Sequence, residues 1–126
     1  MIKIGGVNID VSHPKAFATN LEIHNINMRY EYIFNDGFRS EDEVNWFIKR
    51  FNLNGRMHSI EEMADIVDIG FVQSCNWEKH IDQAMPFIEK GKPVFIDKPI
   101  VGSIKDIKRI EMLVKEGAKI LGSSSL

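Results

Sequence analysis

The stretch HIDQAMPFIEKGKPVFIDKP, residues 80–99, decides the fold class. Its first half repeats apolar residues at helical spacing, namely Ile81, Met85 and Ile88. This spacing predicts a helix over residues 77–89, and Gly91 suits the left-handed residue that commonly ends a helix. Residues 93–96 are a short apolar run, which is typical of a strand buried on both faces. A helix that leads directly into a buried strand is the repeating unit of a parallel sheet.

The same alternation runs along the rest of the chain. Apolar or aromatic runs predict four more strands, over residues 2–7, 28–34, 66–72 and 118–121. Helix starts lie between them: Pro14 suits a first turn, and three serines are each followed three residues later by an acidic residue, namely Ser40, Ser59 and Ser103. We therefore expect an α/β fold, a doubly wound parallel sheet of about six strands with helices on both faces.

Composition and charge exclude several classes of function. The 126 residues suit one domain, and 16 Lys and Arg against 18 Asp and Glu give a net charge of −2. This balance removes the general electrostatic argument for a nucleic-acid or membrane partner. No apolar run approaches the roughly 20 residues of a spanning helix, and the N-terminus lacks the pattern of a secretory signal. The single cysteine and the scattered histidines predict no metal site, so we expect a cytoplasmic protein without metal.

The end of the deciding stretch resembles the Gfo/Idh/MocA family of oxidoreductases, the relatives of glucose–fructose oxidoreductase and inositol dehydrogenase. In that family a helix, a Gly-Lys turn and an apolar strand lead into Glu-Lys-Pro; here Gly91-Lys92 leads into Asp97-Lys98-Pro99. The position of His80 and the order of the elements also match. The resemblance implies a Rossmann-type nucleotide-binding domain over residues 1–126. It further implies an NAD- or NADP-dependent oxidoreductase acting on a sugar, a cyclitol or a related hydroxyl compound.

The resemblance also implies roles for two residues of this motif. Lys98 takes the position of the catalytic lysine, which polarises the reacting hydroxyl or carbonyl group. Asp97 takes the position of the acid that contacts the nicotinamide ribose. Independently of the family, a lysine at the carboxyl end of a parallel strand lies where open α/β sheets bind ligands. We therefore expect a small-molecule ligand at this edge of the sheet.

The turn after the first strand departs from the family pattern. The family's Gly-x-Gly-x-x-Gly turn is replaced by Asn8, Asp10 and His13 at the three glycine positions. A side chain at the second position obstructs the pyrophosphate, and a carboxylate there adds repulsion, unless Asp10 caps the following helix instead. Two observations still allow cofactor binding through these three residues. Asn8 tolerates the left-handed conformation of a tight turn, and Ser12-His13-Pro14 resembles a variant found in some members.

Two further residues, Asp36 and Cys75, are candidates near the cofactor. Asp36 follows the second strand, where the resemblance implies an acid at the adenosine ribose, but its place before Gly37 also fits a turn-forming role. Cys75 begins the positions where the family often shows Thr-Pro-Asn. It is either a cofactor contact with a reactive thiol near the crevice or a small buried residue. Asn76 is expected to cap the next helix, and His80 is expected to pack on that helix rather than bind a ligand.

Two hypotheses about function stay open at this point. The family's substrate pocket and its acid–base pair lie in a C-terminal domain that we expect to be absent from residues 1–126. This chain alone is then not a complete dehydrogenase. It is either the dinucleotide-binding domain of such an enzyme, truncated or divergent, or a non-catalytic binding or scaffold module on the same fold. A homo-oligomer is possible through an exposed apolar edge.

Overall fold

The computed structural model describes residues 1–98 and 100–122. Its six strands are β1 (Ile2–Val7), β2 (Met28–Phe34), β3 (Gly55–Arg56), β4 (Ile69–Val72), β5 (Val94–Ile96) and β6 (Ile120–Gly122). All neighbours pair in parallel, in the order β3-β2-β1-β4-β5-β6. The chain therefore winds outward from β1 in one direction and from β4 in the other, which confirms the doubly wound sheet.

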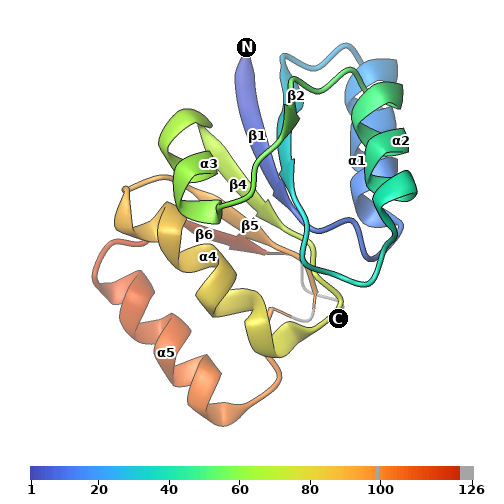
Figure 1. The fold of residues 1–126 in the computed structure, drawn as a ribbon. Coiled ribbons are helices and arrows are strands. Elements are labelled where there is room, and N and C mark those ends of the chain that lie inside the picture. The colour runs from blue at the N-terminus through green and yellow to red at the C-terminus, as the bar shows by residue number, and fades with distance from the viewer. Residues whose placement is uncertain (99, 123–126) are drawn as a thin grey trace.

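The helices cover both faces of this sheet, as Figure 1 shows. They are α1 (His13–Ile23), α2 (Glu41–Arg50), α3 (Ile60–Ile66), α4 (His80–Glu89) and α5 (Ile104–Lys115), with a 3₁₀ turn η1 (Trp77–Lys79) before α4. The buried residues of α1 and α2 pack on one face, and those of α3 and α4, with Ile110 of α5, pack on the other. No helix of the described residues is long and apolar enough to cross a membrane.

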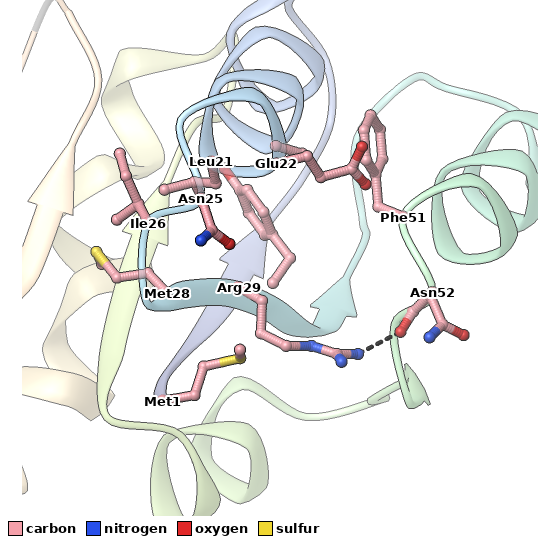
Figure 2. A pocket seen from close by; sticks show the side chains of 11 residues that line it. Met1, Leu21, Glu22, Asn25, Ile26, Met28, Arg29, Phe51 and Asn52 are labelled. Atoms are coloured by element: carbon pink, nitrogen blue, oxygen red, sulfur yellow. Dashed lines mark hydrogen bonds between the residues drawn. The ribbon is translucent and has the colours of Figure 1, made fainter.

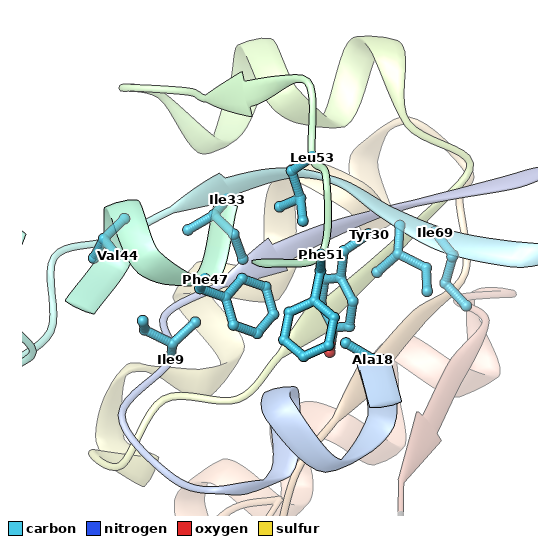
Figure 3. Packing of buried hydrophobic residues seen from close by; sticks show 10 residues of the cluster. Ile9, Ala18, Tyr30, Ile33, Val44, Phe47, Phe51, Leu53 and Ile69 are labelled. Carbon is cyan, nitrogen blue, oxygen red and sulfur yellow. The ribbon is translucent and has the colours of Figure 1, made fainter. Parts of the chain in front are cut away.

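Each face has its own hydrophobic core. The core under α1 and α2 is built around the rings of Tyr30, Phe47 and Phe51, which contact one another through Phe47, with aliphatic side chains such as Ile33 of β2 and Leu53 around them (Figure 3). On the opposite face, Phe87 of α4 packs directly over Gly70 of β4, where a Cβ atom would lie 2.6 Å from the ring carbons. Glycine at this position therefore lets α4 approach the sheet closely.

The helix signals in the sequence are confirmed. The hydroxyls of Ser40, Ser59 and Ser103 each accept a hydrogen bond from the backbone N–H three residues later. Pro14 lies in the first turn of α1, and Gly91 ends α4 with a φ of 69°. These local contacts fix where the helices start and stop, and hence where the connecting loops leave the sheet.

Two predicted boundaries were wrong, and one strand was not predicted. The strand predicted to start at Ile66 starts at Ile69, because α3 continues to Ile66 and buries Met63 and Ala64 at helical spacing. The helix predicted from residue 77 begins as the 3₁₀ turn η1 and becomes α-helical at His80. The two-residue strand β3 was not among the predicted strands. Pro99, the last residue of the Asp-Lys-Pro motif, lies outside the described residues.

Candidate functional site

The loops that follow β1, β2, β4 and β5 meet at the carboxyl edge of the sheet. The direction of winding reverses between β1 and β4, which pair directly with each other. The connections from these two strands leave toward opposite faces, so a crevice opens outside their carboxyl ends. The seven residues predicted to be catalytic or cofactor-binding lie in these loops or, for His13, at the first residue of α1.

Asn8 forms the tight turn after β1. Its φ of 67° is the left-handed conformation expected from the sequence. Its buried side-chain amide donates to Asp36 Oδ1 and to Ser74 Oγ, both at 2.9 Å, and its Oδ1 accepts from the backbone N–H of Asp36 at 2.9 Å. Asn8 therefore joins the ends of β1, β2 and β4.

These ends surround a pocket of about 480 Å³. Its lining residues come from the loops after β1, β2 and β4 and from η1; they are Asn8, Asp10, Asp36, Gly37, Phe38, Ser74, Cys75, Asn76 and Lys79. Asp36 is exposed at this pocket, and Asn8 and Gln83 donate to the same oxygen, Oδ1, of its carboxylate. The turn-forming and ligand-facing roles of Asp36 are thus compatible in this geometry.

Asp10 is buried beside this pocket, with 5% of its surface exposed. Its Oδ2 accepts from the backbone N–H of Cys75 at 2.9 Å, whereas its Oδ1 has no hydrogen-bond partner among the described residues. The carboxylate packs against Gly37, where any Cβ would overlap Oδ1. Asp10 provides no side-chain cap to α1, whose first turn contains no acidic residue. A buried carboxylate with an unpartnered oxygen raises the energy of this loop.

His13 and Asp97 come together from residues 84 positions apart in the chain. His13 Nδ1 lies 2.5 Å from Asp97 Oδ2, and the backbone N–H of Lys98 donates to Asp97 Oδ1 at 2.9 Å. Asp97 is 3% exposed, whereas the side chain of His13 is 40% exposed. Lys98 is exposed beside this pair. Asp97 and Lys98 of the motif therefore lie together with His13, which occupies the third glycine position of the family turn.

A buried tyrosine lies close to the same carboxylate. Burial, and then the negative charge of Asp97, raise the pKa of Tyr30 well above its ordinary value of 10.0, although the hydrogen bond to Gln73 lowers it. The Tyr30 hydroxyl donates to Gln73 Oε1 at 2.6 Å. Sequence analysis missed this pair. The position of Gln73 directly after β4 was a usable signal, but nothing in the spacing pointed to the hydroxyl of Tyr30.

The remaining candidates have structural roles or lie at the rim. His80 is buried, and its ring nitrogens lie 3.0 Å and 2.8 Å from the carbonyl oxygens of Ile100 and Ser74, so it packs between two loops as expected. Asn76 caps η1, accepting from the N–H of Glu78. Cys75 is exposed, so its interpretation as a small buried residue was wrong.

A separate pocket of about 290 Å³ lies at the opposite edge, near the amino ends of β1 and β2 (Figure 2). Its wall mixes apolar side chains with polar and charged ones, and Arg29 donates to the carbonyl oxygen of Asn52. Open α/β sheets bind their ligands at the carboxyl edge, so this pocket is not the candidate site. Within the residues that the structure describes, no three His, Cys, Asp or Glu side chains gather as metal ligands.

The fold has many solved relatives of low sequence identity. The apo scyllo-inositol dehydrogenase from Lactobacillus casei superposes with a TM-score of 0.80 at 22% identity, covering 98% of this chain and 36% of that one. Biliverdin reductase from Synechocystis sp. PCC 6803, in complex with biliverdin and NADP⁺, gives 0.77 at 15% identity, with 97% and 37% covered. A probable dehydrogenase from Thermotoga maritima gives 0.79 at 19% identity, with 97% and 36% covered. The chain thus spans little more than a third of the length of these proteins.

Sequence comparison identifies the family. The search of curated proteins gives no match. Residues 14–124 match the GFO_IDH_MocA family, described as "Oxidoreductase family, NAD-binding Rossmann fold". This match covers most of the chain and agrees with the sheet order and with the Asp97-Lys98 motif at the end of β5. The chain therefore belongs to the Gfo/Idh/MocA oxidoreductase family and corresponds to its NAD-binding Rossmann domain.

Proposed function

We propose that this domain binds NAD(H) across the carboxyl edge of its sheet, as the cofactor-binding part of an oxidoreductase that acts on a hydroxyl compound. The observation that carries the proposal is the pocket between β1, β2 and β4 with the carboxylate of Asp36 at its rim. An acid after the second strand of a Rossmann fold accepts hydrogen bonds from the adenosine ribose. The same acid repels a 2′-phosphate, so the site favours NAD over NADP.

Two features of the loop after β1 suit the rest of a dinucleotide. Asn8 makes the sharp turn without a glycine. The first turn of α1 has neither a side-chain cap nor an acidic residue, which leaves its N–H groups and the positive end of the helix for a diphosphate. Lys79 also lines the pocket and adds positive charge.

Asp10 is the residue of this pocket that suits a dinucleotide least. Its carboxylate is buried between the end of β1 and Cys75, at the second glycine position of the family turn, where a dinucleotide brings its diphosphate. The carboxylate of Asp10 and the diphosphate are both anions, so they repel each other in a partly buried site. We infer that Asp10 weakens dinucleotide binding. If this repulsion prevails, the alternative function is a non-catalytic module that holds an uncharged hydroxyl compound in the same pocket.

Hydride transfer in the proposed enzyme takes place at the end of the crevice formed by the loop after β5. The nicotinamide supplies the hydride acceptor or donor when it is bound. Lys98, exposed beside Asp97, is the candidate that donates a hydrogen bond to the reacting oxygen. A solved relative from Lactobacillus casei holds NAD(H) and scyllo-inositol. A sugar or cyclitol is accordingly the substrate class we propose here.

Fluorescence titration of NADH and NADPH tests the cofactor assignment. Charged hydrogen bonds contribute about 1.5–3 kcal/mol, so Asp36→Ala is expected to weaken NADH binding by about tenfold or more. The affinity for NADPH is expected to stay constant or rise, because the repulsion of its phosphate is lost. Glu111→Ala, which removes an exposed acid on α5, is the matched control and leaves both affinities unchanged. Wild-type protein that binds neither nucleotide would refute the proposal.

A further inference from the structure

We propose that His13 and Asp97 form an acid–base dyad that faces the ligand, with His13 Nε2 exchanging the proton of the substrate hydroxyl. The inference rests on the proposed function for its substrate, but the dyad itself is a property of the free chain. His13 occupies a glycine position of the family's cofactor turn. In this chain it would transfer a proton instead. The base would then belong to this domain itself.

The hydrogen bond between the two residues sets the tautomer of the imidazole. Asp97 Oδ2 lies 2.5 Å from His13 Nδ1, and a carboxylate can only accept, so Nδ1 carries the proton. In the neutral imidazole the other nitrogen, Nε2, then carries the lone pair. The side chain of His13 is 40% exposed, so a ligand can reach it. A neutral imidazole in this arrangement is oriented to accept a proton.

Asp97 is held rigidly as the partner of the imidazole. It is almost fully buried, and its second oxygen accepts from the backbone N–H of Lys98 at 2.9 Å. Its negative charge contributes to the raised pKa of the buried Tyr30, after the larger effect of burial. An ionised carboxylate fixed behind the ring stabilises the imidazolium that forms when Nε2 takes a proton.

The ring of His13 is positioned from its own helix as well. Phe17, one turn further along α1, stacks on it with ring centroids 6.2 Å apart and planes 20° from parallel. Phe17 is in turn held by edge contacts to Phe71 of β4 and Phe95 of β5. The imidazole is therefore oriented both by Asp97 and by an aromatic cluster on the sheet.

The proton and the electrons balance in the proposed oxidation. The carbinol C–H bond breaks and its electron pair leaves as hydride to an oxidised nicotinamide dinucleotide. The O–H bond breaks as the C=O double bond forms, and its proton goes to His13 Nε2. In the reduction, the same nitrogen returns the proton to the oxygen. Lys98, the neighbour of Asp97, donates a hydrogen bond to that oxygen as charge develops on it.

Carbethoxylation by diethylpyrocarbonate, followed by peptide mass spectrometry, tests the dyad in the free chain. The reagent acylates an unprotonated ring nitrogen, so the rate for each histidine reports the nucleophilicity of its ring and the access to it. His13 is expected to react several-fold faster than His24, which is exposed at the end of α1. Buried His80 remains unmodified while the protein is folded.

The variant Asp97→Asn separates a dyad from a structural contact. Loss of the carboxylate slows the reaction of His13 if Asp97 activates it. If the pair is only a tie between α1 and β5, the freed and more exposed ring reacts faster, which would overturn the proposal. His13 reacting more slowly than His24 in the wild type overturns it equally.

Protection by NAD⁺ separates this inference from the proposed function. Saturating NAD⁺ is expected to slow the reaction of His13 several-fold and to leave His24 unchanged. If NAD⁺ stabilises the protein but does not protect His13, the dyad does not face the ligand and the inference fails. If NAD⁺ does not bind at all, the proposed function fails, whereas the comparison of wild type with Asp97→Asn still decides whether the dyad exists.

Discussion

Replacing Asp10 with asparagine is expected to strengthen the binding of NADH. The carboxylate lies at the second glycine position of the turn, and its Oδ1 is buried without a hydrogen-bond partner among the described residues. Asparagine has nearly the same shape. Its amide oxygen can still accept the N–H of Cys75, which now bonds to Asp10 Oδ2 at 2.9 Å. Asp10→Asn thus removes the charge and keeps the hydrogen bond that holds the loop.

The magnitude follows from the electrostatics of the site. Two unit charges 4–8 Å apart repel by about 2–4 kcal/mol at an effective dielectric constant of 20. Salt and the nearby Lys79 screen part of this repulsion. We therefore expect a gain of at least about 1.4 kcal/mol, which is a tenfold lower dissociation constant.

Isothermal titration with three ligands tests this reasoning. NADH and ADP-ribose carry the diphosphate, whereas adenosine carries none, so only the first two are expected to bind more tightly to Asp10→Asn. Asp42→Asn removes an exposed acid of α2 that does not line the pocket, and it serves as the control for net charge. An equal gain for adenosine, or no gain for NADH, would show that Asp10 does not oppose the diphosphate.

Two further predictions concern the scaffold of the site. Gly70→Ala places a methyl group 2.6 Å from the ring of Phe87, so chemical denaturation should show a loss of about 1–3 kcal/mol, and Phe87→Leu in the same chain should recover part of it. An unchanged midpoint would mean that α4 does not pack this closely on β4. The raised pKa of Tyr30 keeps it neutral in the folded state after the unfolded chain ionises, so stability falls as the pH rises above about 10. Denaturation midpoints from pH 8 to 11 should fall less steeply for Tyr30→Phe; equal slopes would contradict the assignment.

Periodicity and capping residues predicted most of this fold because both act locally. The apolar runs of β1, β2 and β5 and the serine caps at Ser40 and Ser103 are readable within a few residues of sequence. The start of β4 was misplaced because the apolar residues on both sides of Asp68 read as one strand, whereas Ile66 ends α3 and the strand begins at Ile69. Strand β3 has only two residues and owes its pairing to Tyr32 and Ile33 of β2, which no local pattern records.

The site was predictable in its location but not in its contacts. Strand ends fix which loops share the carboxyl edge, so Asp36 and Lys98 could be placed there from sequence. The bond from Cys75 to Asp10 spans 65 residues. Neither this bond nor the pairing of His13 with Asp97 follows from spacing, because both depend on how the completed sheet aligns separate loops.

Thermal unfolding of the chain with NAD⁺, NADH, NADP⁺ and NADPH at millimolar concentration tests the central claim most directly. A ligand that binds only the folded state at 100 times its dissociation constant adds about 2.7 kcal/mol of stability. For a domain of this size, that raises the midpoint by on the order of 10 °C. We predict a clear rise with NAD⁺ and NADH and a smaller one with the phosphorylated pair, because Asp36 repels the 2′-phosphate. An unchanged midpoint with all four nucleotides would contradict cofactor binding and leave the non-catalytic module as the function of this fold.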